Sequence, residues 1–137
     1  MMVLDTDHIS ILQHAGSAAA LTLINRLETL DPNEVSTSAI TLEEQSRSWL
    51  SLIHRYTDVR QQVAYYDRLT AMFDFFAGWR VLRFDEAAAD EFLRLRSQRI
   101  RIATTDLKIA AIALVQDATL LSRSLSLSPP IPLLKTI

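Results

Sequence analysis

The fold is decided at the start of the chain, by the segment Met2-Val3-Leu4-Asp5-Thr6-Asp7. A short apolar run is followed at once by polar residues and then by a helix-like stretch, which is typical of a buried parallel strand. Ligand sites in open α/β sheets lie at the carboxyl edge of such strands. The sequence therefore predicts that Asp5 stands at a functional edge of a sheet.

The rest of the chain alternates strand-like and helix-like patterns. Strands are predicted over residues 35–39, 79–84 and 118–121, with an edge strand over 131–137. Helices are predicted over residues 18–30, 41–77 with a turn near 54–58, 85–97, and from 104 or 105 onward. Helices of this length between strands imply right-handed parallel crossovers. We expect one α/β domain over residues 1–137, a three-layer α/β/α sandwich with a central parallel sheet of four or five strands.

Composition narrows the function classes. The 137 residues are 49% hydrophobic and 22% charged, which suits one folded core rather than a disordered chain. The absence of cysteine excludes disulfides, thiolate zinc sites and cysteine nucleophiles. Two glycines leave no room for a phosphate-binding loop. No signal peptide or membrane span is apparent, so we expect a cytoplasmic protein.

The charge pattern neither predicts nor excludes nucleic-acid binding. The formal net charge of −2 provides no global basic field. A local basic tract at Arg94, Arg96, Arg99 and Arg101 could form the rim of a nuclease site. A nuclease also recruits phosphate through metal ions bound to its own acids, so a weak field is compatible with an RNA substrate.

Three acids are predicted to converge at one edge of the sheet. Asp5 follows the first strand, Glu44 lies near the start of the helix after the second, and Asp106 near the start of the helix before the fourth. Converging carboxylates repel one another and imply a hard divalent cation, for which Mg²⁺ or Mn²⁺ is the natural choice.

Helix capping is the alternative explanation for each acid taken alone. Thr41 and Glu44 have the spacing of a capping box, and Thr104 or Thr105 could cap the helix that contains Asp106. Acids in a first turn are also favoured by the helix dipole. Asp5 is harder to explain in this way, because a strand-end acid has no helix to cap unless Thr6 or Asp7 shares that role.

The chain resembles the PIN domains, and specifically the VapC-type toxins. Three blocks carry the resemblance, in order and spacing: Val3-Leu4-Asp5-Thr6-Asp7-His8-Ile9-Ser10, Ser38-Ala39-Ile40-Thr41-Leu42-Glu43-Glu44 and Asp106-Leu107-Lys108-Ile109-Ala110-Ala111-Ile112-Ala113. The second block selects Glu44 over its neighbour Glu43. The resemblance implies a metal-dependent endoribonuclease that is the toxin of a toxin–antitoxin pair.

The resemblance also implies roles for individual residues. Asp5, Asp106 and Glu44 would hold one or two Mg²⁺ or Mn²⁺ ions that activate a water to attack an RNA phosphodiester, and Glu44 would be a ligand or orient that water. Thr6 would assist, and Asp7 would cap the following helix. A small antitoxin protein and a second copy of the chain are the implied partners. Arg99, Arg101 and Arg123 are either phosphate contacts or solvated charges.

A fourth block departs from the family pattern. In Thr119-Leu120-Leu121-Ser122-Arg123-Ser124, the last position is a serine where the family has asparagine or aspartate. Serine can hold a water near the metal but brings no charge, so metal affinity should fall. A catalytically weakened PIN-fold binding module is therefore the first alternative function.

A phosphatase is a further alternative function at this stage. Asp5-Thr6-Asp7 also fits the start of a haloacid-dehalogenase-like phosphatase, but Lys108 and Lys135 are the only lysines and no glycine–aspartate metal motif follows. His8, His14 and His54 lack the spacing of zinc ligands.

Residues 59–76 are rich in apolar side chains, namely Val63, Tyr65, Tyr66, Leu69, Met72, Phe73 and Phe76. They form either core or a surface for the antitoxin or a second copy.

Overall fold

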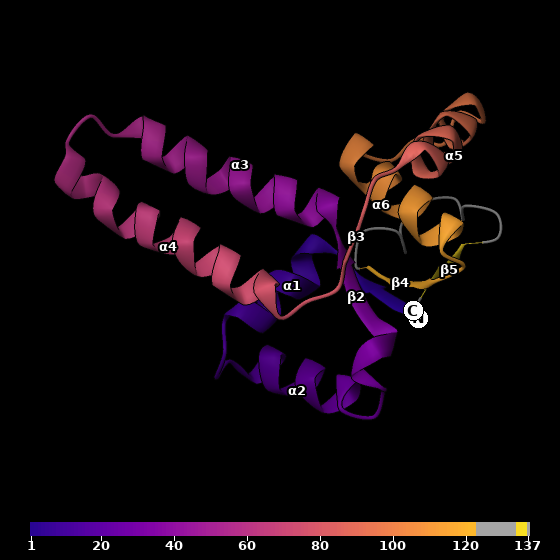
Figure 1. The fold of residues 1–137 in the computed structure, drawn as a ribbon, viewed down its shortest axis with the longest axis horizontal. Coiled ribbons are helices and arrows are strands. Elements are labelled where there is room, and N and C mark those ends of the chain that lie inside the picture. The colour runs from indigo at the N-terminus through magenta and orange to yellow at the C-terminus, as the bar shows by residue number, and fades with distance from the viewer. Residues whose placement is uncertain (123–133, 137) are drawn as a thin grey trace.

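A parallel sheet lies at the centre of the computed structural model, which describes residues 1–122 and 134–136. Its strand order is β3-β2-β1-β4-β5, and every neighbouring pair is parallel (Figure 1). The strands are β1 (Met2–Leu4), β2 (Val35–Ser38), β3 (Val81–Leu82), β4 (Thr119–Leu121) and β5 (Lys135–Thr136). The predicted α/β class and parallel sheet are confirmed. The edge strand expected over 131–137 is present as β5, and residues 131–133 and 137 lie outside the described part of the chain.

The helices follow the predicted order. They are α1 (Thr6–Gln13), α2 (Ala18–Leu27), α3 (Ala39–Arg55), α4 (Val59–Ala77), α5 (Glu86–Ser97) and α6 (Thr104–Val115), with a short 3₁₀ helix η1 (Pro32–Glu34) before β2. The long segment divides into α3 and α4 at Tyr56-Thr57-Asp58, and Gly78 caps the end of α4, as predicted. Figure 1 shows that the α3–α4 hairpin extends away from the sheet.

The two faces of the sheet are covered by different helices. Val3 and Leu4 are both fully buried, and they belong to two separate apolar clusters because successive strand residues point to opposite faces. Val3 packs with Ile109 and Ile112 of α6, whereas Leu4 packs with residues from α1, α2 and α4. The predicted three-layer α/β/α sandwich is therefore confirmed.

Helix α6 is buried on nearly all sides. Its residues Ala110, Ala111 and Ala113 are fully buried, and their small side chains allow α6 to lie between the sheet and α5. In the described part of the chain, none of the helices combines the length and hydropathy needed to span a lipid bilayer.

The strand order places a topological switch point at β1. From β1 the chain builds β2 and β3 on one side, then crosses to build β4 and β5 on the other. Ligands bind outside the carboxyl ends of the strands at such a point. The starts of α1, α3 and α6 meet at this edge, because each helix runs back against the parallel strands. These are the segments that carry the predicted acids.

Candidate metal and nuclease site

Asp5 is held firmly at the end of the central strand. The residue is 4% exposed, and its backbone N–H donates to the carbonyl oxygen of Leu121 in β4 at 3.2 Å. Its Oδ1 accepts from the backbone N–H of His8 at 3.0 Å, which makes Asp5 the N-cap of α1. The expectations that Asp5 has no helix to cap and that Asp7 is the cap were wrong. Helix α1 begins at Thr6, directly after β1, so no residue separates strand end from helix cap.

His8 is a site residue that the sequence analysis missed. Its Nδ1 lies 2.7 Å from Asp5 Oδ1, and the two side chains are only 12% and 6% exposed. Because a carboxylate only accepts, the imidazole donates from Nδ1. The signal in the sequence was the N-cap to N3 spacing, at which a side chain reaches back towards its own cap. Oδ1 thus accepts two hydrogen bonds from His8, and a carboxylate has a second oxygen for another ligand.

Glu44 is held by the predicted accessory residue, Thr6. The Thr6 hydroxyl donates to Glu44 Oε1 at 2.6 Å, and Thr6 Oγ1 lies 3.1 Å from Thr41 Oγ1. Because a hydroxyl has one hydrogen, Thr6 accepts from Thr41 while it donates to Glu44. The chain of bonds joins the start of α1 to α3, and it fixes one oxygen of a half-buried carboxylate beside Asp5.

The predicted capping box at Thr41 and Glu44 was wrong. Helix α3 begins three residues earlier than that motif requires, and Ser38 is its cap, with Ser38 Oγ accepting from the Thr41 backbone N–H at 3.4 Å. Glu44 therefore lies in the second turn of α3, where no unpaired backbone N–H needs a partner. Capping no longer explains Glu44, and its contact with Thr6 across the helix interface points to a different role.

Asp106 lies in the first turn of α6, as predicted, but the predicted caps were wrong. Ala103 occupies the cap position and makes no side-chain cap bond, because α6 already begins at Thr104. The carboxylate of Asp106 thus stands at a helix start that no hydroxyl caps. A negative charge there interacts favourably with the helix dipole.

Asp106 is close enough to the other predicted acids for their negative charges to affect its pKa. Burial raises the pKa of Asp106, and the negative charges of Glu44, Asp5 and Asp7 raise it further, in that order. These acids come from α1, α3 and α6, which are distant in the sequence. The predicted convergence of Asp5, Glu44 and Asp106 at one edge is therefore supported by their mutual repulsion.

The chemistry of this cluster suits a hard divalent cation. Its donors are carboxylate oxygens and a threonine hydroxyl, which are the ligand types that Mg²⁺ and Mn²⁺ prefer, and their unbalanced charge calls for a cation. Among residues 1–122 and 134–136, no three histidine, aspartate or glutamate side chains lie close enough together to hold a metal ion by themselves. The Asp5 carboxylate faces His8 and that of Glu44 faces Thr6. A cation would be bound through their remaining oxygens and through water.

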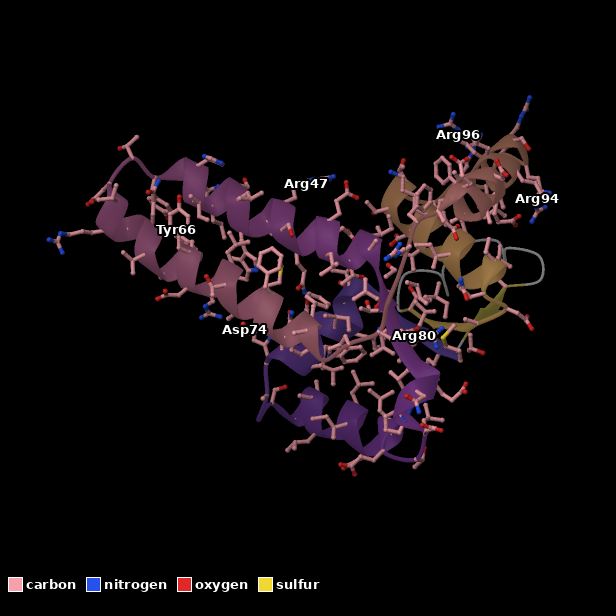
Figure 2. All side chains as sticks on the ribbon, viewed as in Figure 1. Arg47, Tyr66, Asp74, Arg80, Arg94 and Arg96 are labelled. Carbon is pink, nitrogen blue, oxygen red and sulfur yellow. The ribbon has the colours of Figure 1, made fainter. Side chains whose placement is uncertain are left out.

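The basic tract divides into two parts. Arg94 and Arg96 project from α5 (Figure 2), where Arg94 pairs with Glu91 and Arg96 lies over the Phe92 ring at 5.4 Å. Arg99 and Arg101 are exposed and lie in the connection that leads into α6, at the same edge of the sheet as Asp106. Arg99 adopts a left-handed φ of 59°, a conformation that a non-glycine residue rarely adopts. Arg99 and Arg101 are the better placed of the four to meet a phosphate.

Two predicted positions lie outside the described residues. Ser124, where the fourth acid of the family was expected, and Arg123, a candidate phosphate contact, both fall within residues 123–133. The predicted weakening of the site by Ser124 therefore stays a prediction.

Comparison with known proteins gives one family. A family model described as the PIN domain matches residues 2–124. Among solved structures, FitAcB from Neisseria gonorrhoeae is 28% identical with a TM-score of 0.65, over 90% of this chain and 88% of that one. No curated protein matches the sequence.

Two more distant structures share the fold. A toxin-antitoxin complex from Klebsiella pneumoniae is 18% identical with a TM-score of 0.59, over 100% of this chain and 96% of that one. VapC20 from Mycobacterium tuberculosis, described as a sarcin-ricin loop cleaving toxin, is 22% identical with a TM-score of 0.53, over 88% and 87%.

Proposed function

This chain belongs to the PIN domain family, and on that premise we propose that it is a metal-dependent endoribonuclease of the VapC type, the toxin of a toxin–antitoxin pair. One observation carries the proposal. Asp5, Glu44 and Asp106 lie on segments that are distant in the sequence, yet burial and then the charges of Glu44 and Asp5 raise the pKa of Asp106. Such an arrangement costs stability and has no capping explanation at Glu44, so a functional role accounts for it better.

We propose the following roles for the residues of the site. Asp5, Glu44 and Asp106 hold one or two Mg²⁺ or Mn²⁺ ions. When bound, the ion supplies Lewis-acid stabilisation of the phosphodiester and activates the attacking water. His8 fixes the carboxylate of Asp5, and Thr6 fixes that of Glu44. Glu44 acts as a ligand or orients the water. Arg99 and Arg101 contact flanking phosphates.

A small antitoxin protein is the proposed partner, and α4 offers a surface for it. Four apolar side chains along one side of α4 are exposed, Val59 by 71%, Val63 by 54%, Tyr66 by 52% and Phe73 by 61%. We call these four residues the α4 stripe. Met72 and Phe76 are instead buried, so the core and the surface interpretations of residues 59–76 each hold for part of the segment. Exposed apolar residues gathered on one helix mark an interaction surface.

The described relatives support this assignment. The K. pneumoniae structure is a toxin-antitoxin complex, and the M. tuberculosis protein is described as a sarcin-ricin loop cleaving toxin. A second copy of the chain, which the resemblance also implies, is the alternative partner for the α4 stripe. The match to the PIN domain gives no support to the phosphatase alternative.

The test is cleavage of a mixed panel of single-stranded RNAs by purified protein in Mn²⁺ or Mg²⁺, repeated in excess chelator. We expect cleavage that the chelator stops. Cleavage that persists in the chelator would refute the metal-dependent mechanism. Binding of a small co-expressed partner without any RNA cleavage or divalent-metal binding would favour the weakened binding module.

A further inference from the structure

A pocket of about 420 Å³, lined mainly by polar residue types and by Trp49, opens between α1 and α3. Thr6 and Glu44 line one end of it, and Gln13, Gln45 and Trp49 line its walls. Its volume lies within the range of about 300 to 1,000 Å³ that is usual for pockets that bind small ligands or ligand groups. Because Thr6 and Glu44 form the hydrogen-bonded pair of the site described above, the pocket is continuous with that site.

The interface between α1 and α3 is polar where packed helices usually bury apolar side chains. Gln45 is 7% exposed, and its amide makes a reciprocal pair with the amide of Gln13, with both N–H···O distances at 2.8 Å. Gln45 Nε2 also donates to Ser10 Oγ at 3.3 Å. Stability alone does not require this neutral network, since apolar residues of the same size would pack there without it.

Gln13 has hydrogen-bonding capacity left over. An amide side chain has two N–H donors and an oxygen with two lone pairs. Gln45 uses both of its N–H groups, on Gln13 and Ser10, whereas Gln13 uses one N–H and one lone pair on Gln45. In the part of the chain that the structure describes, nothing engages its second N–H or second lone pair. The remaining N–H and lone pair point to opposite sides of the amide, so Gln13 can form one hydrogen bond to the edge of a nucleobase while it stays paired with Gln45.

Trp49 and Arg47 supply the other two contacts that a nucleotide needs. Trp49 lines the pocket and is half-buried against the apolar cluster that contains Met72, so its ring is held in place. Single-stranded RNA is commonly bound by stacking of a base on such a ring. Arg47 projects from α3 (Figure 2), where its pair with Glu43 is exposed by 67% and 44%. Such a pair is weak, so Arg47 can exchange Glu43 for a phosphate.

We propose that this pocket binds the base of the nucleotide next to the cleaved phosphate, with Trp49 stacking on the base and Gln13 reading its edge. The choice of RNA rests on the proposed function. The competing occupant is a segment of a protein partner. The lining offers the Gln13 amide for hydrogen bonding and the Trp49 ring for stacking, beside the charged Glu44 and Arg47. A stacking ring next to a hydrogen-bonding amide favours a nucleobase over a peptide side chain.

The test compares Gln13→Leu with Gln61→Leu, a matched change at an exposed residue of α4 that does not line the pocket. Cleavage sites of the full-length protein in Mn²⁺ are mapped on a mixed RNA panel. We expect Gln13→Leu to lower cleavage at preferred bases by up to about tenfold, the effect of losing one hydrogen bond to the base, and to broaden base preference. Gln61→Leu should change neither.

A binding measurement makes the result independent of catalysis. A single-stranded oligoribonucleotide is titrated into the Asp106→Asn protein, which carries one repelling charge fewer, while tryptophan fluorescence and the anisotropy of the labelled RNA are followed. The chain has two tryptophans, so Trp49→Phe identifies the one that responds. We expect RNA to quench fluorescence, Trp49→Phe to remove the quenching but retain binding, and Gln13→Leu to weaken binding. The quenching of Trp49 fluorescence shows whether RNA enters the pocket even if Gln13→Leu fails to fold.

The outcomes separate this proposal from the proposed function. Cleavage that is indifferent to Gln13→Leu, without quenching at Trp49, overturns the base pocket and leaves the nuclease. Quenching at Trp49 and loss of RNA binding in Gln13→Leu, without cleavage, support the pocket and overturn the nuclease. Absence of both overturns both. An effect of Gln13→Leu on a protein partner alone assigns the pocket to that partner and refutes the nucleobase.

Discussion

Replacing His8 by leucine tests how the site holds its central carboxylate. The substitution keeps the side-chain volume approximately and removes the Nδ1–H that donates to Asp5 at 2.7 Å. The backbone N–H of His8 still caps the same oxygen at 3.0 Å, so helix α1 should form. What is lost is one hydrogen bond to a charged group, and a bond of that kind contributes about 1.5 to 3 kcal/mol.

The upper end of that range applies here. The side chains of Asp5 and His8 are only 6% and 12% exposed, so water cannot easily replace the lost donor. We therefore expect the free energy of unfolding of the metal-free protein to fall by about 3 kcal/mol. For a domain of this size, that loss corresponds to a decrease in Tm of roughly 10 °C.

Urea unfolding followed by circular dichroism measures the change, with an unaltered m-value as the sign that the unfolded state is the same. His8→Asn keeps a donor near the position of Nδ1 and should recover most of the loss. His14→Leu is the matched control, because His14 is exposed and its side chain, among the described residues, bonds only the Ser10 carbonyl. If His8→Leu is as stable as His14→Leu, His8 does not hold Asp5 and the account of this carboxylate is wrong.

Three other changes test the rest of the site. Thr6→Val removes the 2.6 Å bond to half-buried Glu44 and should cost about 1.5 kcal/mol of stability in urea unfolding, with Thr6→Ser as the control that keeps the hydroxyl. The raised pKa of Asp106 means that the folded protein binds the carboxyl proton of Asp106 more tightly than the unfolded chain does. Ionisation of Asp106 therefore opposes folding, and the stability of the metal-free protein falls as pH rises through that pKa. Asp106→Asn should raise the Tm of the metal-free protein at neutral pH but not at pH values below the ordinary pKa range of aspartate. Equal changes in Tm at the two pH values would contradict the repulsion among these carboxylates. Arg99→Gly relieves a φ of 59° and should add about 1 kcal/mol of stability while weakening RNA binding in anisotropy titrations, whereas unchanged RNA binding would remove Arg99 from the phosphate contacts.

The order of elements and the approximate position of the acids were predictable from the sequence. An apolar run that ends in polar residues identified β1, and a run of residues that favour strands identified β2. Parallel topology then brings the carboxyl ends of the strands to one edge, which is why Asp5, Glu44 and Asp106 could be grouped without a structure.

The helix starts were less predictable, because the strands pass into helices without a loop. Helix α1 follows β1 immediately, so Asp5 both ends the strand and caps the helix. Helix α3 begins at Ala39 under the cap of Ser38, which moves Glu44 out of the first turn. A sequence pattern locates a boundary only to within a few residues, and at these two junctions that difference separates a capping acid from a site acid.

The contacts of single side chains were not predictable. The N-cap to N3 spacing that pairs His8 with Asp5 can be used only once Asp5 is known to be the cap, and the sequence pattern did not locate the start of α1 so closely. Along α4, both Met72 and Phe73 are apolar, yet the first is 3% exposed and the second 61%. The sequence cannot distinguish them, because exposure here follows from the way the α3–α4 hairpin extends away from the sheet (Figure 1).

The most direct test of the metal-dependent nuclease is RNA cleavage by Asp5→Asn. Asparagine is a good N-cap, so its Oδ1 can still accept from the His8 backbone N–H and α1 should be retained, while the charge that a cation needs is lost. Cleavage of single-stranded RNA in Mn²⁺ is compared between wild type and Asp5→Asn, with circular dichroism to show that both are folded. We expect Mn²⁺-dependent cleavage by the wild type and none by folded Asp5→Asn, whereas equal cleavage by both proteins would contradict the carboxylate site.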